Sequence, residues 1–235
     1  MKIVVIGGVA AGMSFAAKMK RLDKEAEIVV YEKGSEISYA ACGLPYYIAG
    51  EIKEIESLFA RTKEEFEEDG LKVHLNHEVT KVDLEKKSLE GKDFKDSFDK
   101  LIIATGAEPV VPPLKNDQLD NIFTLKSPED AKEILKALVD VQRVTIVGGG
   151  YIGLEMLEAL LELRKEVRLI QRPERLLPKY DREFTDLLEE ELKEKVTLHF
   201  KESVEGFEGK EKVEQIVTEK GTYETEAVIL AVGYK

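Results

Sequence analysis

The sequence contains a single cysteine, and its neighbours suit a reactive role. Cys42 stands three residues before Pro45 and eight before Gly50. Proline favours the first turn of a helix and glycine favours its end, so the spacing predicts a short helix that begins just after the cysteine. The positive end of a helix dipole stabilises a thiolate. Cys42 is therefore a candidate redox-active thiol, with a small buried hydrophobic residue as the alternative interpretation.

A complete dinucleotide-binding pattern lies in the second half of the chain. Gly148, Gly150 and Gly153 have the spacing G-x-G-x-x-G. The first glycine permits a tight turn, the second lets the backbone approach a pyrophosphate, and the third lets helix and strand pack closely. The free N–H groups of the following helix would bind the phosphates. We favour this interpretation over a tight turn in another kind of α/β protein.

A similar turn near the start of the chain departs from the pattern. Gly7 and Gly12 are present, but Val9 stands where the second glycine belongs. Glu32 supports a binding role, because it ends the next strand 20 residues past Gly12, where a carboxylate can hold ribose hydroxyls. The alternative is a solvated glutamate at the end of a strand.

The matching position in the second half is Gln171, followed by Arg172. A carboxylate there would favour a free 2′-hydroxyl and repel a 2′-phosphate, and it is missing. Arg172, Arg168 or Arg175 could meet that phosphate instead. NADH and NADPH therefore both remain open.

These motifs are positioned by two copies of one plan. In each copy an apolar run enters the glycine turn, a helix leads to a second strand, and a buried strand ends at a small-residue turn. This order is a βαβ unit, whose parallel sheet is covered by helices. We predict an α/β fold with two Rossmann-like units in series. In the first copy these segments are Lys2–Ile6, a helix to about Leu22, 28–32 and 101–106. In the second copy they are Arg143–Val147, a helix to about Leu163, 167–171 and 228–233.

The connector between the copies contains Pro112 and Pro113. We place the boundary there, with residues 1–112 in the first domain and 113–235 in the second. Ser127 and Pro128 then start a helix as N-cap and first helical residue. The helix that starts near Gly153 has no glycine at its end.

Composition limits the possible functions. The chain has 235 residues, of which 43% are hydrophobic, and a net charge of −12, which argues against general nucleic-acid binding. No apolar run approaches the roughly 20 residues that a membrane span needs. One cysteine cannot form an internal disulfide, so we expect a cytoplasmic protein. The three histidines form no recognisable metal set with Cys42, and we predict no metal site.

Four motifs in order carry a family resemblance: Gly7–Ser14, Tyr39–Tyr47, Ala104–Pro109 and Gly148–Glu155. Together they resemble the single-cysteine class of flavoprotein disulfide reductases, which includes coenzyme A-disulfide reductases, NADH oxidases, NADH peroxidases and persulfide reductases. The resemblance runs from Met1 to Lys235. It implies a glutathione-reductase-like fold with FAD in the first domain and NADH or NADPH in the second.

The resemblance also implies site residues. Electrons would pass from NAD(P)H through flavin to Cys42, with Tyr151 over the flavin and Glu155 near the same face. Tyr151 could instead merely pack, and Glu155 could be an ordinary helical charge. The residues implied to contact FAD are Gly7, Gly8, Ala10, Ala11, Gly12, Glu32, Lys33, Thr105 and Gly106. Those implied to contact the nicotinamide nucleotide are Gly148, Gly150, Tyr151, Ile152, Gly153, Gln171, Arg172 and Gly233.

Within the family, Ala10 favours one branch. Oxidases and peroxidases usually carry a histidine in the first glycine turn, and Ala10 is there instead. We therefore expect a small disulfide or persulfide as electron acceptor, with coenzyme A disulfide preferred. Lys18, Arg21 and Arg61 are candidate phosphate-binding residues for coenzyme A, or simply a solvated basic face. The alternatives are an NADH oxidase that reduces oxygen, and a non-catalytic nucleotide-binding fragment of a longer enzyme.

Relatives of this class continue beyond the position of Lys235. They add a segment that returns to the FAD domain, and then a dimerisation domain. The resemblance therefore implies that the FAD domain is incomplete here and holds flavin weakly, and that the parent enzyme is a homodimer.

Overall fold

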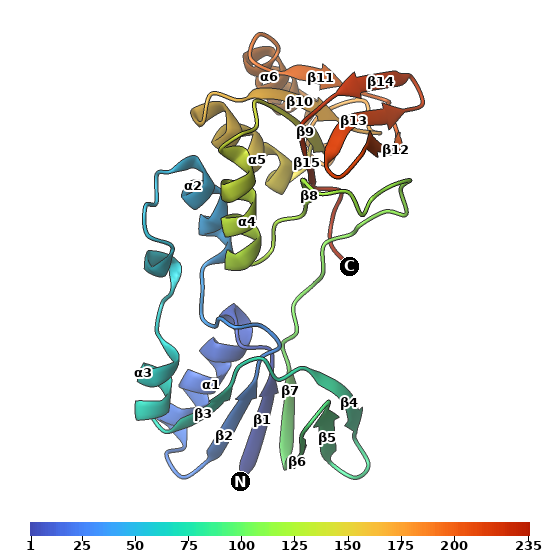
Figure 1. Cartoon of the computed structure of the whole chain (residues 1–235). Helices are drawn as coiled ribbons and strands as arrows, with labels where there is room; N and C mark the ends of the chain where they lie inside the picture. The colour runs from blue at the N-terminus through green and yellow to red at the C-terminus, as the bar shows by residue number, and fades with distance from the viewer. The chain divides into compact units, whose positions relative to one another are not determined.

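The computed structural model describes the whole chain, residues 1–235, as two compact units (Figure 1). The first unit contains residues 1–40 and 55–106, and the second contains residues 41–54 and 107–235. No helix of either unit is both long enough and apolar enough to cross a bilayer.

The first unit is built on a parallel sheet with the strand order β3-β2-β1-β7 (Figure 1). Its strands are β1 (Lys2–Ile6), β2 (Glu27–Tyr31), β3 (Leu71–His74) and β7 (Lys100–Ile103). Its helices are α1 (Ala10–Leu22), the 3-10 helix η2 (Ile55–Leu58) and α3 (Lys63–Glu68). The strand, glycine turn and helix predicted from the sequence are confirmed here.

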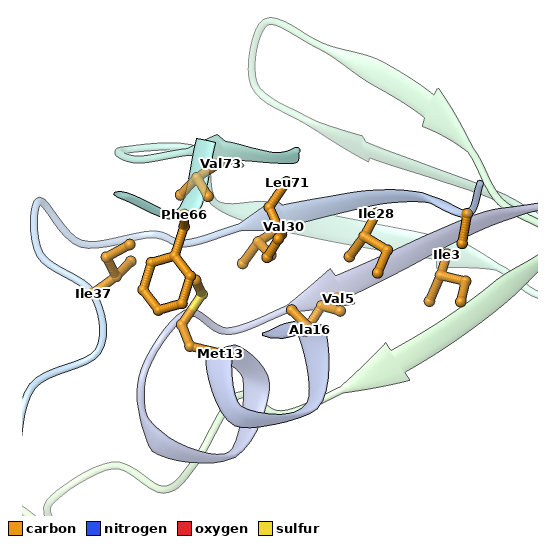
Figure 2. Packing of buried hydrophobic residues seen from close by; sticks show 11 residues of the cluster. Ile3, Val5, Met13, Ala16, Ile28, Val30, Ile37, Phe66, Leu71 and Val73 are labelled. Carbon is orange, nitrogen blue, oxygen red and sulfur yellow. The ribbon is translucent and has the colours of Figure 1, made fainter. Parts of the chain in front are cut away.

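The sheet of the first unit is buried on both faces. Figure 2 shows Met13 and Ala16 on the side of α1 that faces the strands, with Phe66 of α3 in the same apolar cluster. An antiparallel sheet covers the other face and buries Leu89 and Phe98 against it. Its strands are β4 (Val79–Asp83), β5 (Ser88–Gly91) and β6 (Lys95–Ser97). Burial on both faces explains why β1 and β2 are continuous apolar runs.

The second unit repeats this plan with one more strand, in the order β11-β10-β9-β15-β8. These strands are β8 (Ile122–Phe123), β9 (Arg143–Val147), β10 (Glu166–Ile170), β11 (Thr197–His199) and β15 (Ala227–Leu230). Its α-helices are α2 (Leu44–Ala49), α4 (Pro128–Leu138), α5 (Tyr151–Glu162) and α6 (Arg182–Leu192), and η1 (Ala41–Gly43) is a 3-10 helix. Ser127 is the N-cap of α4 and Pro128 lies in its first turn, as predicted, and Ser127 also forms a capping box with Asp130.

A three-stranded antiparallel sheet also precedes the last strand of the second unit. It contains β12 (Val204–Gly209), β13 (Val213–Thr218) and β14 (Gly221–Glu224). The prediction of two Rossmann-like units is confirmed. The two antiparallel sheets were not predicted.

The end of α5 shows how a helix stops without glycine. Arg164 adopts a left-handed conformation with φ +56°. The N–H of Arg164 donates to the carbonyl of Leu161, and the N–H of Lys165 donates to that of Leu160, at 2.8 and 2.9 Å. These two bonds form the Schellman arrangement. An arginine therefore occupies the position that glycine usually takes.

The connector after Gly106 is bonded to the last residues of the chain. Glu108 and Lys235 exchange backbone hydrogen bonds of 2.9 and 3.0 Å, and the N–H of Val110 donates to Gly233. These bonds fix the connector to the last residues of the chain, so residues 107–112 group with the second unit. The assignment of FAD and NAD(P)H to particular domains stays a prediction.

Candidate dinucleotide and thiol sites

The strands of each sheet end level with one another. Ile6, the last residue of β1, pairs with the last residues of both β2 and β7. Gly7, Glu32 and the segment 104–106 follow these strand ends and therefore lie along one edge of the sheet. In α/β folds this carboxyl edge is where ligands bind.

The second unit has the same arrangement at its own carboxyl edge. Val147, which ends β9, pairs with the last residues of β10 and β15. Gly148, Gln171 and the segment 231–233 follow these strand ends. The predicted nucleotide-contact residues of each unit are thus brought to a common edge.

The first glycine of each turn is required by conformation and by space. Gly7 has φ +102° and Gly148 has φ +109°. A Cβ atom on Gly7 would lie 2.2 Å from the carbonyl oxygen of Ala104, and one on Gly148 would lie 2.4 Å from that of Ala231. Both turns therefore need glycine here.

The third glycine of each turn sits where helix and strand meet. A Cβ atom on Gly12 would lie 1.8 Å from the carbonyl oxygen of Gly7, and one on Gly153 would lie 2.0 Å from that of Gly148. Both obstacles are backbone atoms, so neither can rotate away. Close packing at this position depends on the missing side chain.

Replacing Gly153 by alanine should therefore destabilise the second unit. We expect a loss in the free energy of unfolding near the upper end of the about 1–3 kcal/mol typical of overpacking. Gly150→Ala is the matched control, because a Cβ atom there would meet nothing within 4 Å. Urea denaturation should place the control within about 0.5 kcal/mol of wild type. Equal stabilities for the two variants would contradict this packing.

The second position of the pattern has a different requirement. Gly150 has φ −87° and ψ −170°, and Val9 has φ −98° and ψ −141°. Both φ values are negative, so neither position needs glycine for its backbone conformation. The valine in the first turn is therefore compatible with the same backbone, which explains how the sequence can depart from the pattern without losing the turn.

The helices that follow the two turns begin with free backbone donors. Neither α1 nor α5 has a side-chain cap or an acidic residue in its first turn. By contrast, α3 and α4 both begin with capping boxes. The first N–H groups of a helix need partners. The uncapped starts of α1 and α5 suit the phosphates of a dinucleotide, so the residues present fit one such ligand in each unit.

Glu32 and Gln171 also have a backbone role that the sequence did not indicate. The Glu32 carboxylate accepts hydrogen bonds from the N–H groups of Gly8 and Gly34, at 2.6 and 2.8 Å, and is 8% exposed. The Gln171 amide oxygen accepts from the N–H of Gly149 at 2.9 Å. Each side chain thus fixes its glycine turn. The remaining lone pairs of a carboxylate at this edge can accept from ribose hydroxyls.

Cys42 is exposed and lies in η1, directly before α2. The predicted short helix is confirmed, with Pro45 in its first turn. Gly50 ends it with φ +82°. Helix α2 packs against α4 and α5. The helix that directly follows the thiol thus lies beside α5, the helix that begins at the second glycine turn. No local sequence pattern predicts this packing.

Glu155 faces a pocket between α2 and α5. The pocket is lined by Pro45, Tyr46, Ala49, Glu51, Glu155, Glu158 and Ala159. Partial burial raises the pKa of the Glu155 carboxyl, and the nearby charge of Glu158 adds to the effect. A carboxyl with a raised pKa keeps its proton to a higher pH than an ordinary glutamate does.

The raised pKa of Glu155 predicts a pH-dependent stability. The native state favours the protonated carboxyl, so its ionisation costs stability as the pH rises above about 4.5. Glu155→Gln removes this cost and should raise the melting temperature by about 1–2 °C at neutral pH. The difference should vanish near pH 4. Glu162→Gln, an exposed change on the same helix, should have no effect; a pH-independent difference for Glu155→Gln would contradict the assignment.

Tyr151 is 62% exposed at the start of α5. Its hydroxyl contacts the hydroxyl of Tyr180 in a short hydrogen bond, and the two rings meet edge to face with centroids 6.0 Å apart. This bond raises the pKa of the Tyr151 hydroxyl. Sequence reasoning missed Tyr180, because no periodicity or motif links residues that are 29 positions apart.

The three basic candidates differ in their surroundings. Lys18 and Arg21 are exposed on α1, with no hydrogen bond or ion pair. Arg61 is engaged locally: its guanidinium pairs with Asp69 at 2.8 Å and covers the ring of Phe66 at 4.4 Å. Lys18 and Arg21 are therefore the better candidates for binding an anionic ligand. No group of three or more His, Cys, Asp and Glu side chains is arranged to hold a metal ion.

Comparison with known proteins decides the family. The whole chain, residues 1–235, matches the family described as pyridine nucleotide-disulphide oxidoreductase. The chain belongs to this family. FAD is characteristic of pyridine nucleotide-disulphide oxidoreductases, which agrees with two dinucleotide-binding turns in one chain.

The individual relatives include proteins named as sulfur or persulfide reductases and proteins named as NADH oxidases. An NAD(P)H sulfur oxidoreductase (CoA-dependent) of Pyrococcus abyssi is 43% identical, covering 99% of this chain and 53% of the relative. A water-forming NADH oxidase from Lactobacillus brevis, bound to NADH, superposes with a TM-score of 0.96 at 32% identity, covering 100% of this chain and 54% of that one. An NAD-dependent persulfide reductase from A. fulgidus superposes with a TM-score of 0.95 at 33% identity, covering 100% of this chain and 46% of that one. The chain spans about half the length of these pyridine nucleotide-disulphide oxidoreductases.

Proposed function

We propose that this chain carries the nucleotide-binding and thiol parts of an FAD-dependent oxidoreductase that reduces a small disulfide or persulfide. Electrons come from NAD(P)H and reach Cys42, and coenzyme A disulfide is the preferred acceptor. The proposal rests on an exposed Cys42 directly before α2, because α2 packs against α5, the helix of the second glycine turn. We infer NAD(P)H as the electron donor from the family to which the chain belongs.

We assign FAD to the first domain and NAD(P)H to the second. Gly7, Gly12 and Glu32 would hold FAD together with the uncapped start of α1. Gly148, Gly153 and α5 would hold the nicotinamide nucleotide. Bound flavin would supply two-electron transfer between nicotinamide and thiol.

Cys42 would alternate between a mixed disulfide and a thiolate. In the oxidised state its sulfur is bonded to the sulfur of a small thiol. Two electrons break this S–S bond, the small thiol leaves with a proton, and Cys42 stays as a thiolate. The thiolate attacks one sulfur of the next disulfide, which releases a second small thiol and restores the mixed disulfide.

Mass spectrometry of the purified chain tests this role of the thiol. Incubation with coenzyme A disulfide should add the mass of one coenzyme A, and a reductant should remove it. Cys42→Ser should gain no mass. A folded wild-type chain that gains none would contradict the proposal.

Lys18 and Arg21 are proposed to bind the phosphates of coenzyme A. The double variant Lys18→Ala/Arg21→Ala should raise the KM for coenzyme A disulfide about tenfold at low salt, with little change in kcat, because two charge-assisted hydrogen bonds are lost. The wild-type KM should rise with ionic strength. Lys92→Ala/Lys100→Ala removes the same charge elsewhere on the first unit and should leave the KM unchanged. A KM unaltered by the first pair of changes would discard this binding surface.

NADH oxidase activity is the second candidate, and the similarity to a water-forming NADH oxidase favours it. In that case Cys42 would cycle through a sulfenic acid. Ala10 argues against it, since it provides no acid or base in the first turn. Oxygen uptake with NADH, compared between wild type and Cys42→Ser, separates the two: a rate that depends on Cys42 and exceeds disulfide reduction would favour the oxidase.

The whole protein is proposed to be a cytoplasmic homodimer. The single cysteine of this chain supports the location, because it offers no disulfide within these 235 residues. The family resemblance supports the oligomeric state.

A further inference from the structure

In both units, equivalent backbone hydrogen bonds surround the end of the second strand and so form a shared backbone frame. The N–H of Glu32 donates to the carbonyl of His74 and that of Gln171 to His199, both at 2.9 Å. The N–H of Ser38 donates to Gly8 at 2.9 Å, and that of Leu177 to Gly149 at 3.1 Å. Residues 32–38 and 171–177 therefore correspond one for one.

The correspondence extends to the loop after the third strand of each sheet. The N–H of Asn76 donates to the carbonyl of Gly34 at 2.9 Å, and the N–H of Lys201 donates to that of Pro173 at 3.1 Å. Asn76 therefore corresponds to Lys201. Each sheet edge can be compared with the other, position by position.

The charges on this shared frame are reversed. The segment 32–38 contains two acids and one base: Glu32, Glu36 and Lys33. The segment 171–177 contains two bases and one acid: Arg172, Arg175 and Glu174. A lysine also replaces Asn76. The ribose edge of the second unit is therefore cationic, whereas the first is anionic.

Among the cations of the second edge, Arg172 is the free one. Arg175 donates to the carbonyl of Pro178 at 3.0 Å, and Lys201 pairs with Glu174 at 3.0 Å. Arg168 covers the ring of Tyr223 at 4.8 Å. Arg172 is exposed and has no hydrogen bond or ion pair. Its guanidinium is available to an anion.

Gln171 is uncharged and stands where a carboxylate would repel such an anion. It is 5% exposed, its amide oxygen accepts from Gly149 at 2.9 Å, and its amide nitrogen donates to the carbonyl of Arg175. The glutamine thus performs the structural task of Glu32 without a negative charge. A carboxylate in its place would repel a 2′-phosphate.

We propose that the second unit selects the 2′-phosphorylated nucleotide, NADPH over NADH, and that Arg172 is the residue that recognises the 2′-phosphate. This inference rests on the proposed function, because it assumes that the nicotinamide nucleotide binds at this edge. Arginine is suited to the role, since its planar fork binds phosphate through two parallel hydrogen bonds.

Calorimetric titration of the 235-residue chain with two nucleotide fragments tests the inference. Adenosine 2′,5′-bisphosphate carries the distinguishing phosphate, and adenosine 5′-diphosphate lacks it. Wild type should bind the bisphosphate at least about tenfold more tightly at low salt. Arg172→Ala should lose this preference. Gln171→Glu can keep the Gly149 hydrogen bond but loses the one donated to Arg175, and it should reverse the preference. A thermal melt checks that this buried change has not unfolded the unit. Lys210→Ala, an exposed change of equal charge on the turn after β12, should retain the preference.

The outcomes separate this inference from the proposed function. Similar affinities for the two fragments in wild type would overturn NADPH selection and leave the nucleotide site intact. A preference that survives Arg172→Ala would overturn the role of that arginine. Binding of neither fragment would overturn the nucleotide site itself, and the inference with it.

Discussion

Serine in place of Cys42 should lower NAD(P)H-driven reduction of coenzyme A disulfide by about a thousandfold or more. A hydroxyl forms no disulfide and stays protonated at neutral pH, so the mixed disulfide and the attacking thiolate are both lost. Release of free coenzyme A thiol, followed with a thiol reagent, measures the effect.

The same substitution should leave the fold unchanged. Cys42 is exposed, so we expect its replacement to alter the free energy of unfolding by less than about 0.5 kcal/mol. Ala41→Ser is the matched control, because it adds a hydroxyl to the neighbouring exposed residue and keeps the thiol. Residual activity above a tenth of wild type in Cys42→Ser would show that the electrons take another route.

Alanine in place of Glu32 should cost about 2–4 kcal/mol in the free energy of unfolding of the first unit. The change leaves the N–H groups of Gly8 and Gly34 without their acceptor, and Gly8 is buried. The glycine turn should loosen, and FAD affinity should fall with it.

Glutamine at the same position should have a smaller effect on stability. Gln171 already bonds the matching N–H of the second turn through an amide oxygen, so Glu32→Gln should keep one of the two hydrogen bonds. Denaturant titration should give the order wild type, Glu32→Gln, Glu32→Ala, with Glu78→Ala as an exposed control. If Glu32→Ala were as stable as Glu78→Ala, the carboxylate would have no role in holding the turn.

The parallel sheets were predictable because their strands are continuous apolar runs. Lys2–Ile6 and Arg143–Val147 end at glycine turns and lead into helices, and this local order defines a βαβ unit. The antiparallel sheets give no such signal. Strand β6, for example, has the sequence Lys-Asp-Ser, which has no apolar residue. It becomes a strand only because it pairs with the neighbouring strand. The end of α5 could not be predicted from the sequence either, because it depends on a left-handed backbone conformation that arginine seldom adopts at Arg164.

The positions of the site residues were easier to predict than their interactions. Spacing placed Glu32 and Gln171 at the ends of their strands. Their bonds to the glycine turns appear only when strand, turn and loop are brought together. The pairing of Tyr151 with Tyr180, and the packing of α2 with the second unit, likewise depend on tertiary contacts between distant segments.

An anaerobic titration shows whether Cys42 receives the electrons. The chain is supplied with enough FAD to saturate its weak site, loaded with coenzyme A on Cys42, and treated with NADPH in steps. The first equivalent should release one coenzyme A per chain and leave the visible flavin absorbance intact, whereas in Cys42→Ser it should bleach that absorbance. If the first equivalent bleaches the wild-type flavin while coenzyme A stays attached, Cys42 is not the electron acceptor.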